Sequence, residues 1–306
     1  MKYLIIGAGG TGGCIGGYLA RAGKDVSFIA RGEHLQAMKE NGLQIKGGCF
    51  GGFTVPVKAY ASEEYTDTPD VIFVCVKAYS LASAAETVRA HAGLETVIVP
   101  ILNGLDIADR TKALLPEHHV IKACMYITAA RTAPGVVENK GDFFKVLLRH
   151  ETPGVPAETP ESIARDLCDA GIEGIVSDNI DLDVYKKYMF ISPLSAAQIS
   201  FDVTVGELRA DAEKLEFYLS LVEDLGALAK KQGVDISWNL REQGIKEIER
   251  RPAGMLASAY LDVKKGRTAE TDGLIMAPIR LGEQLGLEMP AYRKAAEYLQ
   301  KRQIQN

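Results

Sequence analysis

The stretch that decides the fold is Tyr3-Leu4-Ile5-Ile6-Gly7-Ala8-Gly9-Gly10-Thr11-Gly12, in which an apolar run of strand length ends in a glycine cluster. At this spacing Gly7 permits a tight turn, Gly9 lets the backbone approach a pyrophosphate, and Gly12 permits close packing of the next helix. The free N–H groups and the dipole of that helix favour an anion at its start. Glycines at these intervals also occur in ordinary loops, so the flanking strand and helix carry the prediction of a dinucleotide-binding turn.

The residues around this turn predict a strand, helix and strand unit. Residues 2–6 form the first apolar run, residues 11–23 a helix of small residues, and residues 25–30 a second apolar run. Further short apolar runs follow at residues 71–76, 96–99 and 120–127. Between them, residues 81–92 can form a helix. This alternation predicts an α/β fold of Rossmann type, with a mostly parallel sheet covered by helices on both faces. Turn residues within 43–60 and 132–148 predict antiparallel hairpins added to it.

The second half of the chain changes character. A helix near 162–170 and a strand near 174–176 are the last elements of the α/β pattern, and helical spacing continues from residue 182 to the end. A chain of 306 residues is long enough for two domains. We therefore expect a nucleotide-binding domain over 1–179 and an all-helical domain over 180–306. The amphipathic segment 215–231 fits either the central helix of that domain or a dimer seam.

The composition narrows the class of partner. The formal net charge is −5 and the basic residues are scattered, which argues against nucleic acid and anionic membranes and favours a small molecule. No apolar run approaches membrane-spanning length. Five widely spaced cysteines indicate reduced thiols and a cytoplasmic protein. The histidines lack metal-ligand spacing, so we expect no metal site and place all five on the surface: His34, His91, His118, His119 and His150.

Arg31 follows the second strand, at the position that discriminates between coenzymes. A carboxylate there binds a ribose 2′-hydroxyl, whereas a guanidinium matches a 2′-phosphate, so Arg31 indicates NADPH. The alternative is a surface arginine paired with Glu33. Lys77 and Asn103 follow later strands, where an open α/β sheet places its ligands, although a surface charge and an ordinary turn explain them equally well.

With these features in order, the chain resembles the ketopantoate reductase (2-dehydropantoate 2-reductase) family. The matching segments follow the family's order over almost the whole chain: 7–12, Ala30-Arg31-Gly32, Val76-Lys77-Ala78, Leu102-Asn103-Gly104, Tyr185-Lys186-Lys187 and Glu270-Thr271-Asp272-Gly273. The resemblance implies an NADPH-dependent oxidoreductase that reduces 2-dehydropantoate to pantoate for pantothenate and coenzyme A biosynthesis. It implies hydride transfer in a cleft between the two domains, and a homodimer through the helical domain is compatible with it.

The resemblance also implies roles for individual residues. Lys187 matches the general acid, and Glu270 matches the glutamate that holds the substrate hydroxyl. An ammonium beside the ketone can stabilise the developing oxyanion and donate its proton. Ser258 matches a serine that contacts the substrate carboxylate, and Ser195, at the position of a family asparagine, is a further expected substrate contact. Asn103, at the end of a strand, can place its amide beside the nicotinamide ribose or the substrate. The coenzyme-binding set is Gly7, Gly9, Gly10, Thr11, Gly12, Arg31, Lys77 and Asn103.

Two positions depart from the family pattern. The family has asparagines where this chain has Ile191 and Ser195, and Ile191 lies one helical turn after the proposed acid. An apolar side chain there removes a hydrogen bond to the substrate. The identity of the 2-keto acid substrate is therefore open. Three functions therefore remain: reduction of ketopantoate, reduction of another 2-keto acid by the same fold, and NADPH binding without catalysis.

Overall fold

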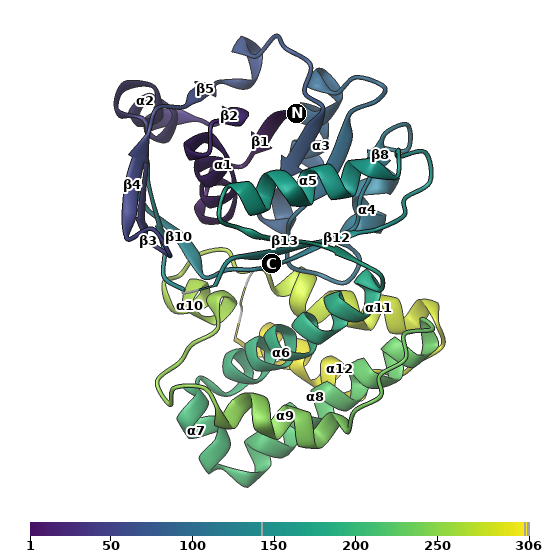
Figure 1. Ribbon diagram of the computed structural model, residues 1–306. Helices are drawn as coiled ribbons and strands as arrows, with labels where there is room; N and C mark the ends of the chain where they lie inside the picture. The colour runs from purple at the N-terminus through teal and green to yellow at the C-terminus, as the bar shows by residue number, and fades with distance from the viewer. Residues whose placement is uncertain (142, 303, 305–306) are drawn as a thin grey trace. The chain divides into compact units, whose positions relative to one another are not determined.

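A computed structural model of the chain describes residues 1–141, 143–302 and 304. The chain forms two compact units, and most of their elements are labelled in Figure 1. Unit 1 holds Met1–Leu102 and Ile107–Ile180, and unit 2 holds Asn103–Asp106 and Asp181–Asn306. The short segment Asn103–Asp106 thus belongs with the helical residues, although it lies within the α/β part of the sequence.

The strands of unit 1 form three sheets over the residues that the structure describes. Their orders are β5-β2-β1-β6-β7-β8, β10-β11-β3-β4 and β13-β12-β9. The strands are β1 (Lys2–Ile6), β2 (Asp25–Ile29), β3 (Leu43–Gly47), β4 (Gly52–Val55), β5 (Lys58–Tyr60), β6 (Val71–Val74), β7 (Val97–Pro100), β8 (His119–Val120), β9 (Ala123–Tyr126), β10 (Ala129–Ala133), β11 (Val136–Asn139), β12 (Lys145–Arg149) and β13 (Glu173–Ser177). The helices of unit 1 are α1 (Gly10–Arg21), α2 (Gly32–Asn41), α3 (Leu81–His91), α4 (Ile107–Leu114) and α5 (Glu158–Asp169).

The first sheet is parallel throughout and is buried on both faces. Alternate side chains of a strand point to opposite faces, and here each face has its own core. Tyr3 and Ile5 pack in the cluster that holds buried residues of α1 and α5. Leu4 and Ile6 pack in the cluster that holds buried residues of α3. The predicted fold class is confirmed, with β1 at the centre of the sheet between β2 and β6.

The expected hairpins are present, but their strands are distributed differently. β3 pairs antiparallel with β4 and β10 with β11, as predicted, and β11 then pairs parallel with β3 to join both hairpins into one sheet. The single strand expected over 120–127 is wrong: β8 ends the parallel sheet and β9 joins the third sheet. Residues 143–148 contribute β12 to that third sheet, against β9 and β13, and do not extend the hairpin.

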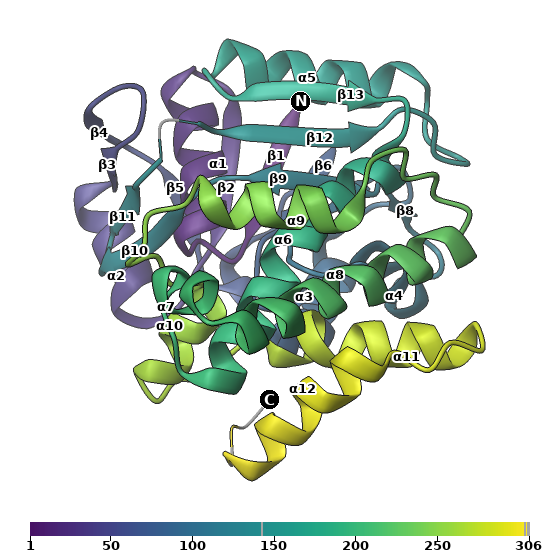
Figure 2. The ribbon, with the colours of Figure 1, turned by 90° about the horizontal axis from the view of Figure 1, so that it is seen from below.

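Unit 2 is helical in the part of it that the structure describes. Its helices are α6 (Ile180–Phe201), α7 (Val205–Ala210), α8 (Ala212–Lys231), α9 (Leu240–Glu249), α10 (Ser258–Lys264), α11 (Ala277–Gln284) and α12 (Pro290–Lys301), and a π-helical turn covers Asp272–Met276. α8 packs against α7, α9, α11 and α12, and Figure 2 shows it beside α9. Its apolar residues, such as Leu221 and Leu225, are fully buried, so this helix forms the core of the unit.

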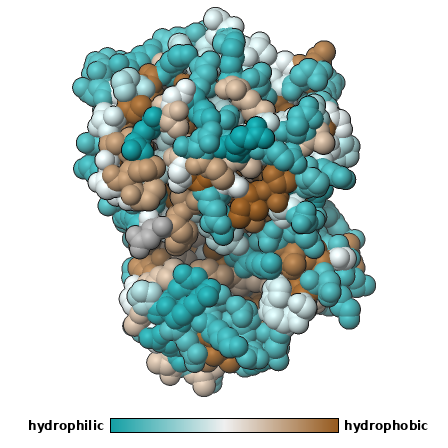
Figure 3. Space-filling model, viewed as in Figure 1, coloured by the Kyte–Doolittle hydropathy of each residue, from teal (hydrophilic) through white to brown (hydrophobic). Residues whose placement is uncertain are grey.

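Polar side chains cover most of the face drawn in Figure 3, with smaller apolar patches between them. The large hydrophobic side chains that are exposed are spread along the chain: Met1, Phe50, Tyr79, Leu94, Phe143 and Leu261. None of the helices among the described residues combines the length and the apolar character that crossing a membrane requires.

Candidate active site

The glycine turn follows β1 and leads directly into α1. Gly7 has φ +97°, a backbone conformation that favours glycine, and a Cβ there would lie 2.8 Å from the carbonyl carbon of Cys75. A Cβ on Gly12 would overlap the carbonyl oxygen of Gly7. A Cβ on Gly9, by contrast, would meet no described atom within 4 Å. The chain therefore needs Gly7 and Gly12 for its own packing, whereas Gly9 leaves open space beside the N-terminus of α1.

The remaining residues of the turn begin the helix. Gly10 is the first residue of α1, and a Cβ there would lie 2.7 Å from the backbone of Ala129 in β10. Thr11 is half-buried in the first turn. The first turn of α1 carries backbone N–H groups without partners inside the helix, which is the chemistry that binds a phosphate.

Two basic residues follow the strands on either side of β1. Arg31 ends the segment after β2 as the N-cap of α2, and Lys77 follows β6; both are exposed. Within the described residues the Arg31 guanidinium has neither a hydrogen bond nor an ion pair, so the expected alternative of pairing with Glu33 is absent. The carboxyl ends of β2, β1 and β6 are neighbours in the sheet, which places Arg31, the glycine turn and Lys77 along one edge.

In unit 2, Lys187 and Asn103 meet although they lie far apart in the sequence. The Nζ of Lys187, on α6, donates a hydrogen bond to Oδ1 of Asn103 at 2.9 Å. Both side chains are half-buried. Nearby, Arg280 lies 3.7 Å from Asp106, so both ends of the segment Asn103–Asp106 contact helical residues. These contacts explain why four residues after β7 group with unit 2.

Glu270 precedes the π-helical turn and is buried, with 5% of its surface exposed. A π-helical turn shifts carbonyls out of the regular helical ladder, and two carbonyls here bond to α6 instead. Tyr188 donates its hydroxyl to the Gly273 carbonyl at 2.6 Å, and Ser192 donates to the Leu274 carbonyl at 2.6 Å. The segment that follows Glu270 is therefore fastened to α6 at the residue next to Lys187.

The two serines expected at the substrate occupy different environments. Ser258 is exposed at the first position of α10, and the preceding Ala257 N–H donates to Oε1 of the fully buried Gln198 at 2.7 Å. Ser195 is buried, and its hydroxyl donates to the Ile191 carbonyl at 2.6 Å, one turn back along α6. Ile191 itself is half-buried.

Comparison with known proteins places the chain in a family. Residues 3–147 match the family model described as ketopantoate reductase PanE/ApbA, and residues 179–303 match the model of its C-terminal part. The chain belongs to the ketopantoate reductase family. It is thus an oxidoreductase of that family, and the two matches cover both units.

Individual relatives match this chain of the ketopantoate reductase family over almost its full length. The uncharacterized oxidoreductase YkpB of Bacillus subtilis strain 168 is 28% identical, with 98% of each chain covered. A 2-dehydropantoate 2-reductase of Streptococcus pyogenes serotype M3 is 25% identical over 97% of this chain and 96% of its own length. A solved structure of D-mandelate dehydrogenase with NADH and anilino(oxo)acetate has a TM-score of 0.86 at 23% identity, with 98% of each chain covered.

The expectation that every histidine lies at the surface is wrong for His34. The His34 side chain is buried, and both of its ring nitrogens form hydrogen bonds with backbone groups of unit 1. The sequence also did not predict the buried hydrogen bonds made by Tyr188, Ser192 and Gln198, because buried hydroxyls and amides on a helix form no recognisable motif. No group of three or more potential metal ligands gathers in the part of the chain that the structure describes.

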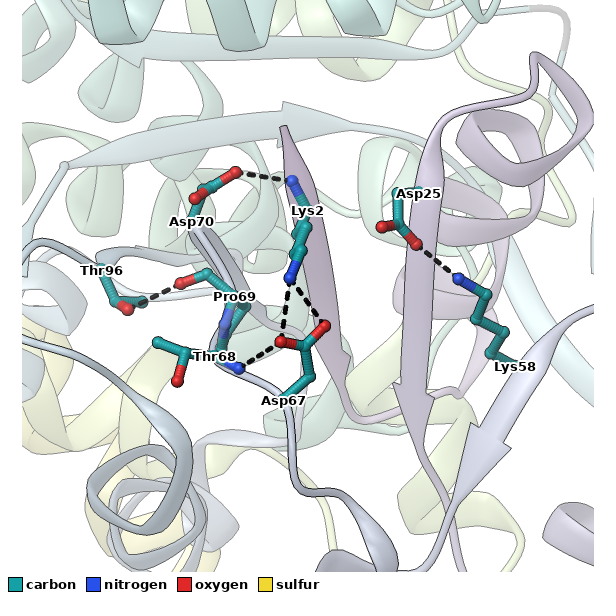
Figure 4. Close-up of polar contacts among 8 residues, drawn as sticks. All are labelled: Lys2, Asp25, Lys58, Asp67, Thr68, Pro69, Asp70 and Thr96. Atoms are coloured by element: carbon teal, nitrogen blue, oxygen red, sulfur yellow. Dashed lines mark hydrogen bonds and ion pairs between the residues drawn. The ribbon is translucent and has the colours of Figure 1, made fainter.

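A cavity opens at the opposite edge of the parallel sheet, where β1, β2 and β5 begin. Figure 4 shows that charges here are paired with one another: Nζ of Lys2 lies 2.9 Å from Asp67, and Nζ of Lys58 lies 2.8 Å from Asp25. An open parallel sheet binds its ligands at the carboxyl ends of its strands. This cavity therefore lies at the edge opposite to the one where such sheets bind their ligands.

Proposed function

We propose that this protein reduces a 2-keto acid with NADPH, and that the substrate is 2-dehydropantoate, which becomes pantoate in pantothenate and coenzyme A biosynthesis. The observation that carries the proposal is the 2.9 Å hydrogen bond from Lys187 to Asn103, in a chain of the ketopantoate reductase family. It holds an ammonium on a half-buried side chain at the position where the family resemblance implies the general acid.

The residues of unit 1 fit a nicotinamide dinucleotide. The space beside Gly9 and the N-terminus of α1 suit a pyrophosphate, and the exposed Arg31 suits a 2′-phosphate. Lys77 adds positive charge after β6. When bound, the reduced nicotinamide supplies a hydride to the carbonyl carbon of the substrate. Because Arg31 favours the phosphorylated coenzyme, we propose NADPH over NADH.

The residues of unit 2 supply the proton and hold the substrate. Hydride addition leaves negative charge on the former carbonyl oxygen, and Lys187 stabilises that charge and transfers a proton from Nζ to the oxygen. The neutral amine then regains a proton from water. The bond to Asn103 uses one of the three N–H donors of the ammonium and fixes its direction. We propose that Glu270 binds a substrate hydroxyl, that Ser258 binds the carboxylate, and that Ser195 is a further substrate contact.

Another 2-keto acid is the alternative substrate, and Ile191 favours it. A half-buried isoleucine next to the acid offers no hydrogen bond, and the Ser195 hydroxyl is already donated to the Ile191 carbonyl. A substrate with an apolar tail in place of a hydroxyl would suit this surface. Ketopantoate and 2-ketoisovalerate differ in this respect, since only the former carries the hydroxymethyl group.

The experiment is a panel of 2-keto acids with NADPH and with NADH, followed through oxidation of the reduced coenzyme. We expect ketopantoate to give the highest kcat/KM, with NADPH preferred. Equal turnover of ketopantoate and pyruvate would remove ketopantoate as the substrate, and a preference for 2-ketoisovalerate would favour the alternative. Coenzyme binding without turnover of any keto acid would indicate a regulator instead of an enzyme.

Lys187→Met tests the general acid directly. Loss of the proton donor should lower kcat by about 10² to 10⁴-fold and leave the Kd for NADPH unchanged. Lys186→Met is the matched control, because Lys186 is an exposed neighbour paired with Asp183 at 3.3 Å. Undiminished turnover in Lys187→Met would show that another group supplies the proton.

A further inference from the structure

His34 connects three parts of unit 1 that surround the glycine turn. It is the third residue of α2, with 5% of its surface exposed. Its Nε2 lies 2.7 Å from the carbonyl oxygen of Ala8, inside the glycine turn. Its Nδ1 accepts a hydrogen bond of 2.9 Å from the N–H of Gly135, in the turn between β10 and β11.

The two backbone partners determine the protonation of the ring. The Gly135 N–H can only donate, so Nδ1 carries no hydrogen, and the Ala8 carbonyl can only accept, so Nε2 carries one. A neutral imidazole has one donor and one acceptor, and both are used here. Burial lowers the pKa of His34; the bond to Ala8 opposes this effect, and the positive charge of Arg131 adds to it.

The bond to Ala8 sets the orientation of the next peptide group. In a planar trans peptide the carbonyl of Ala8 and the N–H of Gly9 point in opposite directions. Fixing this carbonyl on His34 therefore aims the Gly9 N–H away from α2. Gly9 is the N-cap of α1 and borders the open space that we assign to the pyrophosphate.

The same side chain ties the turn to the 2′-phosphate end of the site. His34 lies three residues after Arg31, within the first turn of α2, so its bond to Ala8 docks that turn against the glycine loop. The hydrogen bond from Gly135 anchors the His34 ring further, because the β10–β11 hairpin that holds Gly135 packs against the start of α1 near Gly10.

We propose that His34 is a positioning residue for the coenzyme: it orients the Ala8–Gly9 peptide and holds the start of α2 beside it, and so sets coenzyme affinity without taking part in proton transfer. This inference rests on the proposed binding of NADPH at the glycine turn. It predicts an effect on coenzyme binding that is separate from the keto acid and from kcat.

The test compares three variants by NADPH fluorescence titration, steady-state kinetics and thermal melting. His34→Phe removes both bonds, and we expect the Kd and KM for NADPH to rise roughly tenfold, with kcat at saturating NADPH and the KM for the keto acid nearly unchanged. His34→Gln can accept from Gly135 and donate to Ala8 through one amide, so it should restore most of the affinity. His150→Phe is the control, at an exposed histidine of the same unit whose Nε2 lies 3.3 Å from Glu161, and it should leave the Kd and KM for NADPH unchanged.

His34→Asn keeps the test decisive if His34→Phe does not fold. Its short amide can accept from Gly135 but does not reach Ala8, so it should keep the fold and lose NADPH affinity. Wild-type affinity in His34→Asn or His34→Phe would overturn the inference, as would equal losses in kcat and in both KM values without rescue by glutamine. If the wild-type protein binds neither NADPH nor NADH, the proposed function itself fails.

Discussion

The two edges of the parallel sheet use the same strands in opposite ways. At the edge where β1, β2 and β5 begin, charged side chains face partners of opposite sign, as in the pairs Lys2–Asp67 and Lys58–Asp25. At the edge where β1 and β2 end, the Arg31 guanidinium has no partner among the described residues, and Gly9 borders open space. Groups that are left unsatisfied by the fold are the ones that a ligand can satisfy.

This difference also separates two kinds of glycine in one turn. Gly7 and Gly12 are required by the chain, because a Cβ at either position would overlap protein atoms. Gly9 has no such requirement, because a Cβ there would meet no described atom within 4 Å. Because we propose that the coenzyme binds beside Gly9, substitutions at Gly9 and at Gly12 should give effects of different kinds, the first on binding and the second on stability.

Among substitutions at the two edges of the sheet, the largest effect is expected for Gly9→Ala, and Gly12→Ala is its comparison. The new methyl at Gly9 meets no protein atom, so the melting temperature should stay the same, whereas the Kd for NADPH should rise about a hundredfold because the methyl occupies the pyrophosphate space. Gly12→Ala forces overlap with Gly7 and should lower the free energy of unfolding by about 1 to 3 kcal/mol. Thermal melting and fluorescence titration measure both. Unchanged NADPH binding in Gly9→Ala would contradict the assignment of this edge.

A smaller and more selective effect is expected for Arg31→Ala. Loss of a charged hydrogen bond to the 2′-phosphate should weaken NADPH binding by roughly ten- to a hundredfold and leave NADH binding unchanged, since NADH lacks that phosphate. Titration with both coenzymes measures the difference. Arg165→Ala, at an exposed arginine of α5, is the control. An equal loss for both coenzymes would show that Arg31 does not discriminate between them.

Much of the carboxyl edge could be predicted from the sequence, because its determinants are local. The strand, the glycine spacing and Arg31 lie within one short stretch, and the turn geometry follows from which residues lack a Cβ. The role predicted for Lys187 depended on the family resemblance. Nothing in the local sequence shows that this lysine on α6 reaches the amide of Asn103, 84 residues away.

The features that were missed depend on tertiary contacts. His34 has no ligand spacing, and its burial arises from two backbone groups that lie 26 and 101 residues away. The division of 120–127 into two strands depends on which sheet each half joins. The bonds from Tyr188 and Ser192 to the π-helical turn are equally invisible in a hydrophobic pattern, because hydroxyls on a buried helix resemble ordinary core residues.

The smallest effect is expected at Asp166, a residue of α5 that contacts Tyr3 near the amino end of β1. This carboxylate accepts hydrogen bonds from the Tyr3 hydroxyl at 2.6 Å and from Nζ of Lys24 at 2.7 Å. Asp166→Asn keeps an acceptor for Tyr3 but loses the ion pair, so the free energy of unfolding should fall by about 1 kcal/mol with coenzyme affinity and kcat unchanged. Denaturant unfolding and the keto-acid assay measure the two. Asp169→Asn, at the more exposed partner of Lys24, is the control and should cost less.

The same carboxylate gives this prediction a pH signature. Burial works to raise the pKa of Asp166, but the bonds from Lys24 and Tyr3 outweigh it, and the pKa lies below its ordinary value. A carboxyl whose pKa is lower in the folded state stabilises the fold fully above its unfolded pKa of about 4 and loses that contribution as the pH falls through the folded pKa. The difference in stability between wild type and Asp166→Asn should therefore be constant near neutral pH and shrink below about pH 4. A difference that persists at lower pH would show that packing, and not the ionised carboxylate, stabilises this edge.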